Sequence, residues 1–160
     1  MAVCLVNLRP VAFVTAVFTV VCFVLSGLTV FAQPDVSASC AALMVAETGE
    51  LIYGKNEHDR RSMASTTKIM TSLLAIEALT PQRKITVSAD MLNVEGTSMG
   101  LLPGDTVTLE GLVYGMLLQS GNDAANVTAI TLGGNVENFV SMMNKRAGEI
   151  GMNDTHFETP

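Results

Sequence analysis

The stretch RRSMASTTKIMTSLLAIEAL, at residues 60–79, decides the local fold of this chain. From Ser65 onward its apolar residues recur near the 3.6-residue period of an α-helix, and Pro81 then stops the pattern. The apolar stripe consists of Ile69, Met70, Leu73, Leu74 and Ile76. We therefore expect a helix that begins at Ser65 and buries this stripe.

Ser65 and Lys68 lie three residues apart at the start of the predicted helix, so their side chains share one face. A serine hydroxyl becomes a good nucleophile when a neighbouring base takes its proton, and a neutral lysine can be that base. Burial favours the neutral form of lysine, and a helix N-terminus favours negative charge on the serine oxygen. The spacing thus fits a nucleophile and its base. A helix-capping serine followed by a solvated lysine is the structural alternative.

A second candidate element is the loop Ser120-Gly121-Asn122, which lies between two predicted helices. The Ser120 hydroxyl could relay a proton, and the Asn122 amide could donate to a substrate carbonyl or accept from a lysine. An ordinary turn with an asparagine helix cap is the structural alternative.

The remaining pattern places strands first and helices after them. Cys40–Ala46 and Leu51–Tyr53 flank a turn and predict a β-hairpin, and Lys84–Val87 predicts a short strand. Helices are predicted over 109–119 with a cap at Thr108, over 124–132, and from a cap at Asn135 to Gly151. The stripe of the last helix consists of Phe139, Met142, Met143, Ala147 and Ile150. This order indicates an α+β fold.

The N-terminal segment has the composition of an export signal. Positions 10–34 carry no charged residue, and Val11–Ala32 is almost continuously apolar. Val30-Phe31-Ala32 offers a cleavage site after Ala32. We expect residues 1–32 to be a signal peptide, with an uncleaved membrane anchor as the alternative. Residues 33–160 would then form a domain outside the cytoplasm.

Charge and cysteine content exclude several function classes. The chain has a net charge of −6 and no basic run, so nucleic acid is not an expected partner. Cys4 and Cys22 fall in the leader, which leaves Cys40 without an intrachain disulfide partner. No Cys/His cluster has the spacing of a metal site, so we expect neither a metal nor a cofactor.

The two motifs together resemble the serine penicillin-recognising enzymes, which combine Ser-x-x-Lys, a Ser-x-Asn loop and Lys-Thr-Gly. Residues 64–71 and 117–125 are similar to the nucleophile helix and second motif of the low-molecular-weight D-alanyl-D-alanine carboxypeptidases. The resemblance extends from about Ser39 to Pro160. It implies part of a β-lactamase/transpeptidase-like fold, with the N-terminal hairpin and helical cluster present and the remaining sheet strands absent.

The resemblance also implies an activity: a serine-type carboxypeptidase that removes the terminal D-alanine of peptidoglycan stem peptides. Ser65 would form an acyl-enzyme, and Lys68 would accept its proton. Ser120 would pass a proton to the leaving D-alanine, and Asn122 would hold the substrate carbonyl and help position Lys68. β-Lactam antibiotics would acylate Ser65 by the same route. The protein would act in the periplasm or at the outer face of the cytoplasmic membrane.

The sequence departs from the family pattern because it contains no Lys-Thr-Gly. We therefore expect a fragment of a longer coding sequence, or a truncated gene, that is inactive by itself. One alternative is a class A-like β-lactamase, in which Glu158 would activate the deacylating water. The other is a non-catalytic exported remnant that binds the cell wall.

Overall fold

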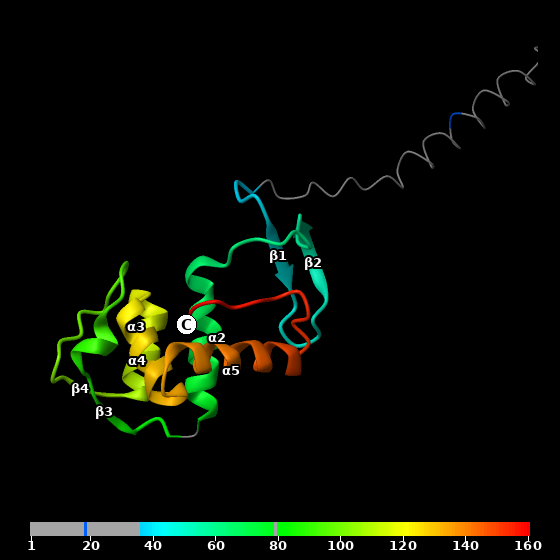
Figure 1. Cartoon of the computed structure of the whole chain (residues 1–160). Helices are drawn as coiled ribbons and strands as arrows, with labels where there is room; N and C mark the ends of the chain where they lie inside the picture. The colour runs from blue at the N-terminus through cyan, green and yellow to red at the C-terminus, as the bar shows by residue number, and fades with distance from the viewer. Residues whose placement is uncertain (1–17, 19–35, 79) are drawn as a thin grey trace, which may run out of the picture. The chain divides into compact units, whose positions relative to one another are not determined.

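The computed structural model describes residues 36–78 and 80–160, together with Phe18 (Figure 1). The expected signal peptide or anchor at residues 1–32 lies outside the described residues, apart from Phe18. Within the described residues, no helix has the length and apolar character needed to cross a bilayer. The chain divides into two compact units, residues 1–59 and 60–160, and each is described separately below.

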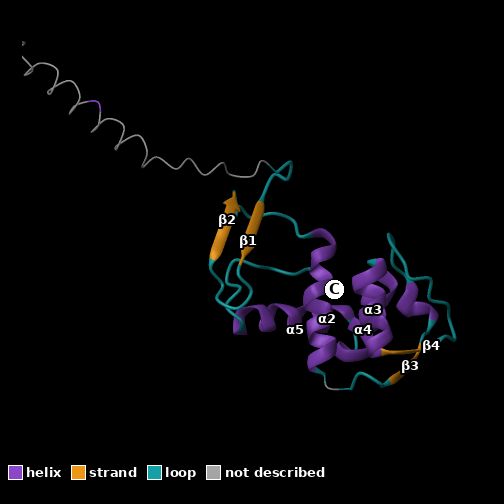
Figure 2. Cartoon of the chain, turned by 180° about the vertical axis from the view of Figure 1, so that it is seen from behind, coloured by secondary structure: helices purple, strands orange, loops and turns teal. Residues whose placement is uncertain are grey.

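The described part of the first unit is a β-hairpin. Strand β1 (Ala41–Met44) pairs antiparallel with β2 (Leu51–Lys55), as Figure 2 shows. The Lys55 ammonium donates a hydrogen bond of 2.6 Å to the carbonyl of Val36, which ties the incoming segment to the second strand. The predicted hairpin is confirmed, with β2 running two residues further than expected.

The second unit is a cluster of helices with a small two-stranded sheet (Figure 2). Its helices are α2 (Thr67–Glu77), α3 (Leu109–Gln119), α4 (Asn122–Gly133) and α5 (Val136–Glu149). Its strands are β3 (Lys84–Thr86) and β4 (Thr106–Thr108). Two short 3-10 turns span Ala64–Thr66 and Ala89–Leu92. The predicted α+β class is confirmed, and strand β4, which pairs antiparallel with β3, was not predicted.

Two predicted helix starts are confirmed by their capping bonds. The Thr108 hydroxyl accepts a 3.0 Å hydrogen bond from the Gly111 N–H at the start of α3. The Asn135 side chain accepts one of 2.7 Å from the Asn138 N–H at the start of α5. Each bond satisfies a backbone donor that has no partner within its helix, and such a cap stabilises a helix by about 1 kcal/mol.

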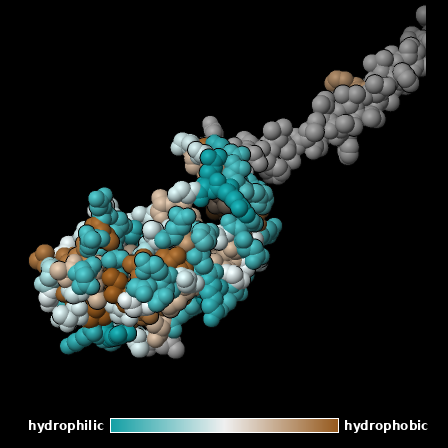
Figure 3. All heavy atoms as spheres, in the orientation of Figure 1, coloured by the Kyte–Doolittle hydropathy of each residue, from teal (hydrophilic) through white to brown (hydrophobic). Residues whose placement is uncertain are grey.

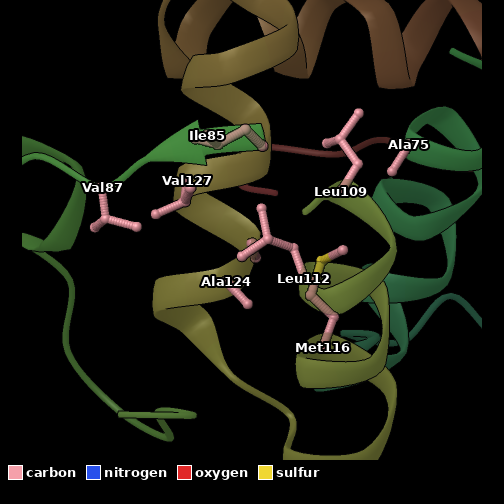
Figure 4. Close-up of a cluster of buried hydrophobic side chains, with 9 residues drawn as sticks. Ala75, Ile85, Val87, Leu109, Leu112, Met116, Ala124 and Val127 are labelled. Atoms are coloured by element: carbon pink, nitrogen blue, oxygen red, sulfur yellow. The ribbon is translucent and has the colours of Figure 1, made fainter. Parts of the chain in front are cut away.

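Two clusters of buried apolar side chains hold the helical unit together. The first lies between β3, α3 and α4, and Figure 4 shows it with Ile85, Val87, Leu109, Leu112, Met116, Ala124 and Val127. The second joins α2, α4 and α5 and consists of Met70, Ala129, Phe139, Met143, Ala147 and Phe157. Helix α4 contributes small residues to both clusters, which lets its neighbours pack closely against it.

The stripe predicted for α2 is only partly buried. Met70 lies in the second cluster, whereas Ile69 and Ile76 are 63% and 60% exposed. These two isoleucines are seven residues apart, so they share a face of the helix, and that face is largely exposed. Met142 of α5 and Ile150, which directly follows that helix, are likewise exposed, although the pattern predicted them to be buried. Figure 3 shows apolar patches interrupting the polar surface of this unit.

Candidate active site

Ser65 lies at the meeting point of two segments that are far apart in the sequence. It occupies the 3-10 turn that precedes α2. Its Oγ accepts a 2.8 Å hydrogen bond from the hydroxyl of Ser120, which follows α3. The Lys68 Nζ lies 3.4 Å from the same oxygen and donates to it. The structure thus brings together three of the four site residues predicted from the sequence.

The capping alternative for Ser65 is wrong. Helix α2 begins at Thr67 and its cap residue is Thr66, whose side chain makes no capping bond. Ser65 lies one residue further upstream, and its hydroxyl oxygen accepts from Ser120 and Lys68 instead. The hydroxyl is therefore engaged with other side chains of the site and not with the end of the helix.

Lys68 is buried, which excludes the solvated alternative for this residue. Only 6% of Lys68 is exposed. Burial lowers the pKa of the Lys68 ammonium below its ordinary value of 10.5, because removing the group from water disfavours its charged form. A larger neutral fraction gives the amine a free lone pair, which is what a base toward the adjacent Ser65 hydroxyl needs.

The backbone is strained on both sides of the Ser65–Ser120 contact. Ala64 has a φ of +46° and Ser120 a φ of +56°. The left-handed region costs an ordinary L-residue about 1–2 kcal/mol, so two such residues at one place need support from their surroundings. Strain of this kind concentrates at functional sites, where it fixes the direction of a side chain.

Asn122 is the first residue of α4, and two hydrogen bonds fix it to an adjacent loop. Its N–H donates to the carbonyl of Thr97 at 2.7 Å, and its Nδ2 donates to the carbonyl of Glu95 at 2.6 Å. The resemblance assigned Asn122 a role in positioning Lys68. Within the part of the chain that the structure describes, however, the side-chain partner of Asn122 is Glu95.

An open cleft of about 500 Å³ lies beside these groups and is lined by Ser65, Lys68 and Asn122. The cleft is also lined by Ala64, Thr67, Val94, Glu95, Asn126, Val136, Thr159 and Pro160. Its walls are mainly apolar around a few convergent polar groups, as is common in small-molecule sites. Among the described residues, no three His, Cys, Asp or Glu side chains lie together as a metal site would require.

Glu158, the glutamate considered for a β-lactamase, is exposed and lines a neighbouring hollow of about 250 Å³ together with Met63 and Ala64. A buried charged residue next to the site that the sequence reasoning did not single out is Asp123, the second residue of α4, which is only 4% exposed. The signal available in the sequence was an acidic residue directly after the Ser-x-Asn motif, at the start of a helix rich in small residues.

The sequence matches a family of known enzymes over most of its length. A family model described as D-alanyl-D-alanine carboxypeptidase matches residues 28–160. The chain is 38% identical over 128 residues to the D-alanyl-D-alanine carboxypeptidase DacF of Bacillus subtilis, covering 77% of the chain and 33% of that protein. It is 36% identical over 137 residues to DacD of Escherichia coli, covering 79% and 35%. The chain therefore spans about a third of the length of these curated relatives.

Solved structures resemble the fold in the same way. The D-alanyl-D-alanine carboxypeptidase DacD from Francisella tularensis matches with a TM-score of 0.75 and 36% identity, over 81% of this chain and 32% of that one. The D-alanyl-D-alanine carboxypeptidase from Mycobacterium tuberculosis matches with a TM-score of 0.78 and 29% identity, over 83% and 50%. The described helices and small sheets thus correspond to part of a transpeptidase-type fold.

Proposed function

The chain belongs to the family of D-alanyl-D-alanine carboxypeptidases, and from that premise we propose that the full-length protein removes the terminal D-alanine of peptidoglycan stem peptides. The observation that carries the proposal is the Ser65 hydroxyl oxygen, which accepts from both the buried Lys68 amine and the Ser120 hydroxyl. A nucleophile in hydrogen-bond reach of a base and of a second proton carrier is the arrangement that acyl transfer requires.

In the proposed first step, the Ser65 Oγ attacks the carbonyl carbon of the bond between the two terminal D-alanines. The Ser65 proton passes to the neutral amine of Lys68, and the carbonyl oxygen becomes an oxyanion. The Ser65 N–H, in the turn that opens α2, is one donor to that oxyanion. The lowered pKa of Lys68 favours this step, because only a neutral amine can take the proton.

In the second step the bond between carbonyl carbon and nitrogen breaks, and the leaving D-alanine amine needs a proton. We assign this delivery to Ser120, whose hydroxyl lies 2.8 Å from the Ser65 oxygen, and the proton that Lys68 took from Ser65 then replaces the one that Ser120 gives up. Asn122, in the wall of the same cleft, would hold the carbonyl group of the substrate peptide. Water then hydrolyses the Ser65 ester, which releases the shortened peptide and restores the serine.

β-Lactams present a reactive amide to the same cleft, so we propose that they acylate Ser65 by the first of these steps. The substrate is cell-wall peptide, and we therefore propose that the protein is exported and acts in the periplasm or on the outer face of the cytoplasmic membrane. The signal peptide or anchor predicted at residues 1–32 would direct that export.

The proposal is tested by D-alanine release from a synthetic peptide ending in D-Ala-D-Ala, with the full-length protein and its Ser65→Ala variant. Ser62→Ala is the matched control, because Ser62 is also an exposed serine of the same segment but lines the neighbouring hollow. We expect release by the wild-type and Ser62→Ala proteins and none by Ser65→Ala. Hydrolysis of a chromogenic cephalosporin without D-alanine release would indicate a β-lactamase instead. A wild-type protein inactive on both substrates would overturn the proposal and favour a non-catalytic role.

A further inference from the structure

Asp123 is a buried carboxylate whose hydrogen-bond partners are all neutral. One oxygen, Oδ2, accepts from the Ser98 hydroxyl at 2.6 Å and from the N–H groups of Gly100 and Leu101 at 3.1 and 3.0 Å. The other, Oδ1, accepts from the N–H groups of Met99 and Ala124, both at 2.9 Å. The carboxylate therefore binds four consecutive residues of one loop, 98–101, to the first turn of α4.

These bonds keep the buried group ionised. Burial by itself would raise the pKa of Asp123, but the hydrogen bonds from Ser98, Met99, Leu101 and Ala124 outweigh it and hold the pKa below its ordinary value of 3.8. A charged acceptor forms stronger hydrogen bonds than a neutral one. The loop is thus fastened by charge-assisted bonds.

The same loop, residues 95–101, also contacts the Ser120-Gly121-Asn122 segment of the site. The carbonyls of Glu95 and Thr97 accept from the side chain and the N–H of Asn122. The Thr97 hydroxyl donates to the carbonyl of Ser120. Residues 95–101 therefore contact Asp123 at one end and both Ser120 and Asn122 at the other.

Two glycines show how closely these groups fit. A Cβ atom at position 96 would lie 2.5 Å from the Asn122 Nδ2. A Cβ atom at position 121 would lie 2.8 Å from the Asp123 Oδ1 and 3.1 Å from the Met99 backbone nitrogen. Neither position leaves room for a side chain, so a movement of the loop would be transmitted directly to Asn122.

From this geometry we propose that Asp123 is a positioning residue for the reaction. Its carboxylate fixes the 95–101 loop, and the loop fixes the orientation of the Asn122 amide and the Ser120 backbone beside Ser65. The inference rests on the proposed function. It adds a residue that contacts no reacting atom. Asp123 instead sets the geometry of Ser120 and Asn122, which would contact the substrate.

The test compares Asp123→Asn with Asp105→Asn in the full-length protein. Asparagine keeps the size of the side chain, but its amide nitrogen would face N–H donors that now meet a carboxylate oxygen. Asp105 is the matched control, since its Oδ2 accepts from the N–H of Leu102 in an exposed turn of the same loop region. Amide hydrogen exchange at Met99, Gly100 and Leu101 should accelerate at least tenfold in Asp123→Asn and remain unchanged in Asp105→Asn.

The catalytic readout is acylation of Ser65 by a fluorescent penicillin. We expect the acylation rate constant at saturating penicillin to fall by about 10²-fold in Asp123→Asn, because small misplacements of a site group have effects of that size. The dissociation constant of the initial complex should change less than threefold. Because part of the effect of Asp123 passes through the Asn122 amide, the same substitution made in an Asn122→Ala protein should lower the rate less.

Ser98→Ala removes one of the five bonds and should give a smaller change in the same direction, which covers the case in which Asp123→Asn does not fold. Unchanged exchange in Asp123→Asn would overturn the proposal. So would an equal loss of rate with and without Asn122, since that result shows that Asp123 does not act on the Asn122 amide. If the wild-type protein is acylated and these effects are missing, only the role of Asp123 fails. If the wild-type protein is not acylated at all, the proposed function fails with it.

Discussion

The hydroxyl oxygens of Ser65 and Ser120 lie 2.8 Å apart, although 55 positions separate the two residues in the sequence. Neither helix propensity nor motif spacing requires this contact, which depends on the packing of α2, α3 and α4 around the two apolar clusters. It joins the proposed nucleophile to the residue that would carry a proton to the leaving group.

Substitution of Ser120 tests that contact. We expect Ser120→Ala to lower D-alanine release by about 10²–10⁴-fold, the usual contribution of a proton-transfer group. The free energy of unfolding should change little, because the lost hydrogen bond is partly exposed. Ser141→Ala is the control, since Ser141 is exposed on α5 and its hydroxyl donates only to the Glu137 carbonyl. Full activity in Ser120→Ala would exclude Ser120 from proton transfer.

Lys68→Met should separate activity from stability. Without the amine, Ser65 has no base, and acylation by penicillin should fall by at least about 10²-fold. The free energy of unfolding should rise by about 1 kcal/mol near neutral pH, because methionine fills the same space without a buried charge. Denaturant unfolding and acylation rates check the two effects. Lys145→Met, at a lysine whose side chain is 80% exposed, should alter neither quantity appreciably.

The buried position of Lys68 also predicts a pH dependence. Its pKa is lowered in the folded protein, so between that value and 10.5 the unfolded chain binds more protons than the folded one. The free energy of unfolding therefore gains a contribution that increases as the pH rises through this window. The acylation rate should increase through the lowered pKa as well. The contribution is measured as the difference in the free energy of unfolding between the wild-type and Lys68→Met proteins at a series of pH values. A difference that does not change with pH would contradict the prediction.

Gly96 and Gly100 form a matched pair for the site loop. Both have positive φ, at +99° and +89°, so alanine is strained at either position. Only at Gly96 would the new Cβ collide with the Asn122 Nδ2, whereas nothing lies within 4 Å of a Cβ at Gly100. We expect both alanine variants to lose about 1–2 kcal/mol of stability. Gly96→Ala should lower the acylation rate more than Gly100→Ala, because Gly100 contacts Asp123 only through its N–H, and equal activities would show that the Asn122 amide does not need its present orientation.

The core of the helical unit can be tested at Phe139. This ring is fully buried in the second cluster, and Phe139→Ala should lower the free energy of unfolding by about 3–5 kcal/mol. Met142 lies on the same helix but is partly exposed, so Met142→Ala should cost about 1 kcal/mol or less. Similar losses in urea unfolding of the two variants would contradict the packing of α5.

Local patterns predicted most of the elements and the Ser65–Lys68 pair. The hairpin, the caps at Thr108 and Asn135, and the shared face of Ser65 and Lys68 depend on residues close together in the sequence. Strand β4 was missed because its last residue, Thr108, is also the cap of α3, so the segment was interpreted as the start of that helix. The exposure of Ile69 could not be predicted, because periodicity identifies an apolar face but not what covers it.

The contacts of Asp123 with the site loop also could not be predicted from neighbouring residues in the sequence. Asp123 binds residues 22–25 positions earlier, so its role depends on how the 95–101 loop returns to α4. From the sequence alone it could be read only as an acidic residue in the first turn of a helix, where such residues are common.

The absence of space at Gly121 restricts how this motif can evolve. Its φ of −64° is open to any amino acid, so the restriction comes from the carboxylate that fills the volume a side chain would need. A larger residue at position 121 becomes acceptable only if position 123 changes with it. In relatives of this protein, a residue other than glycine at position 121 should therefore occur together with a change at position 123.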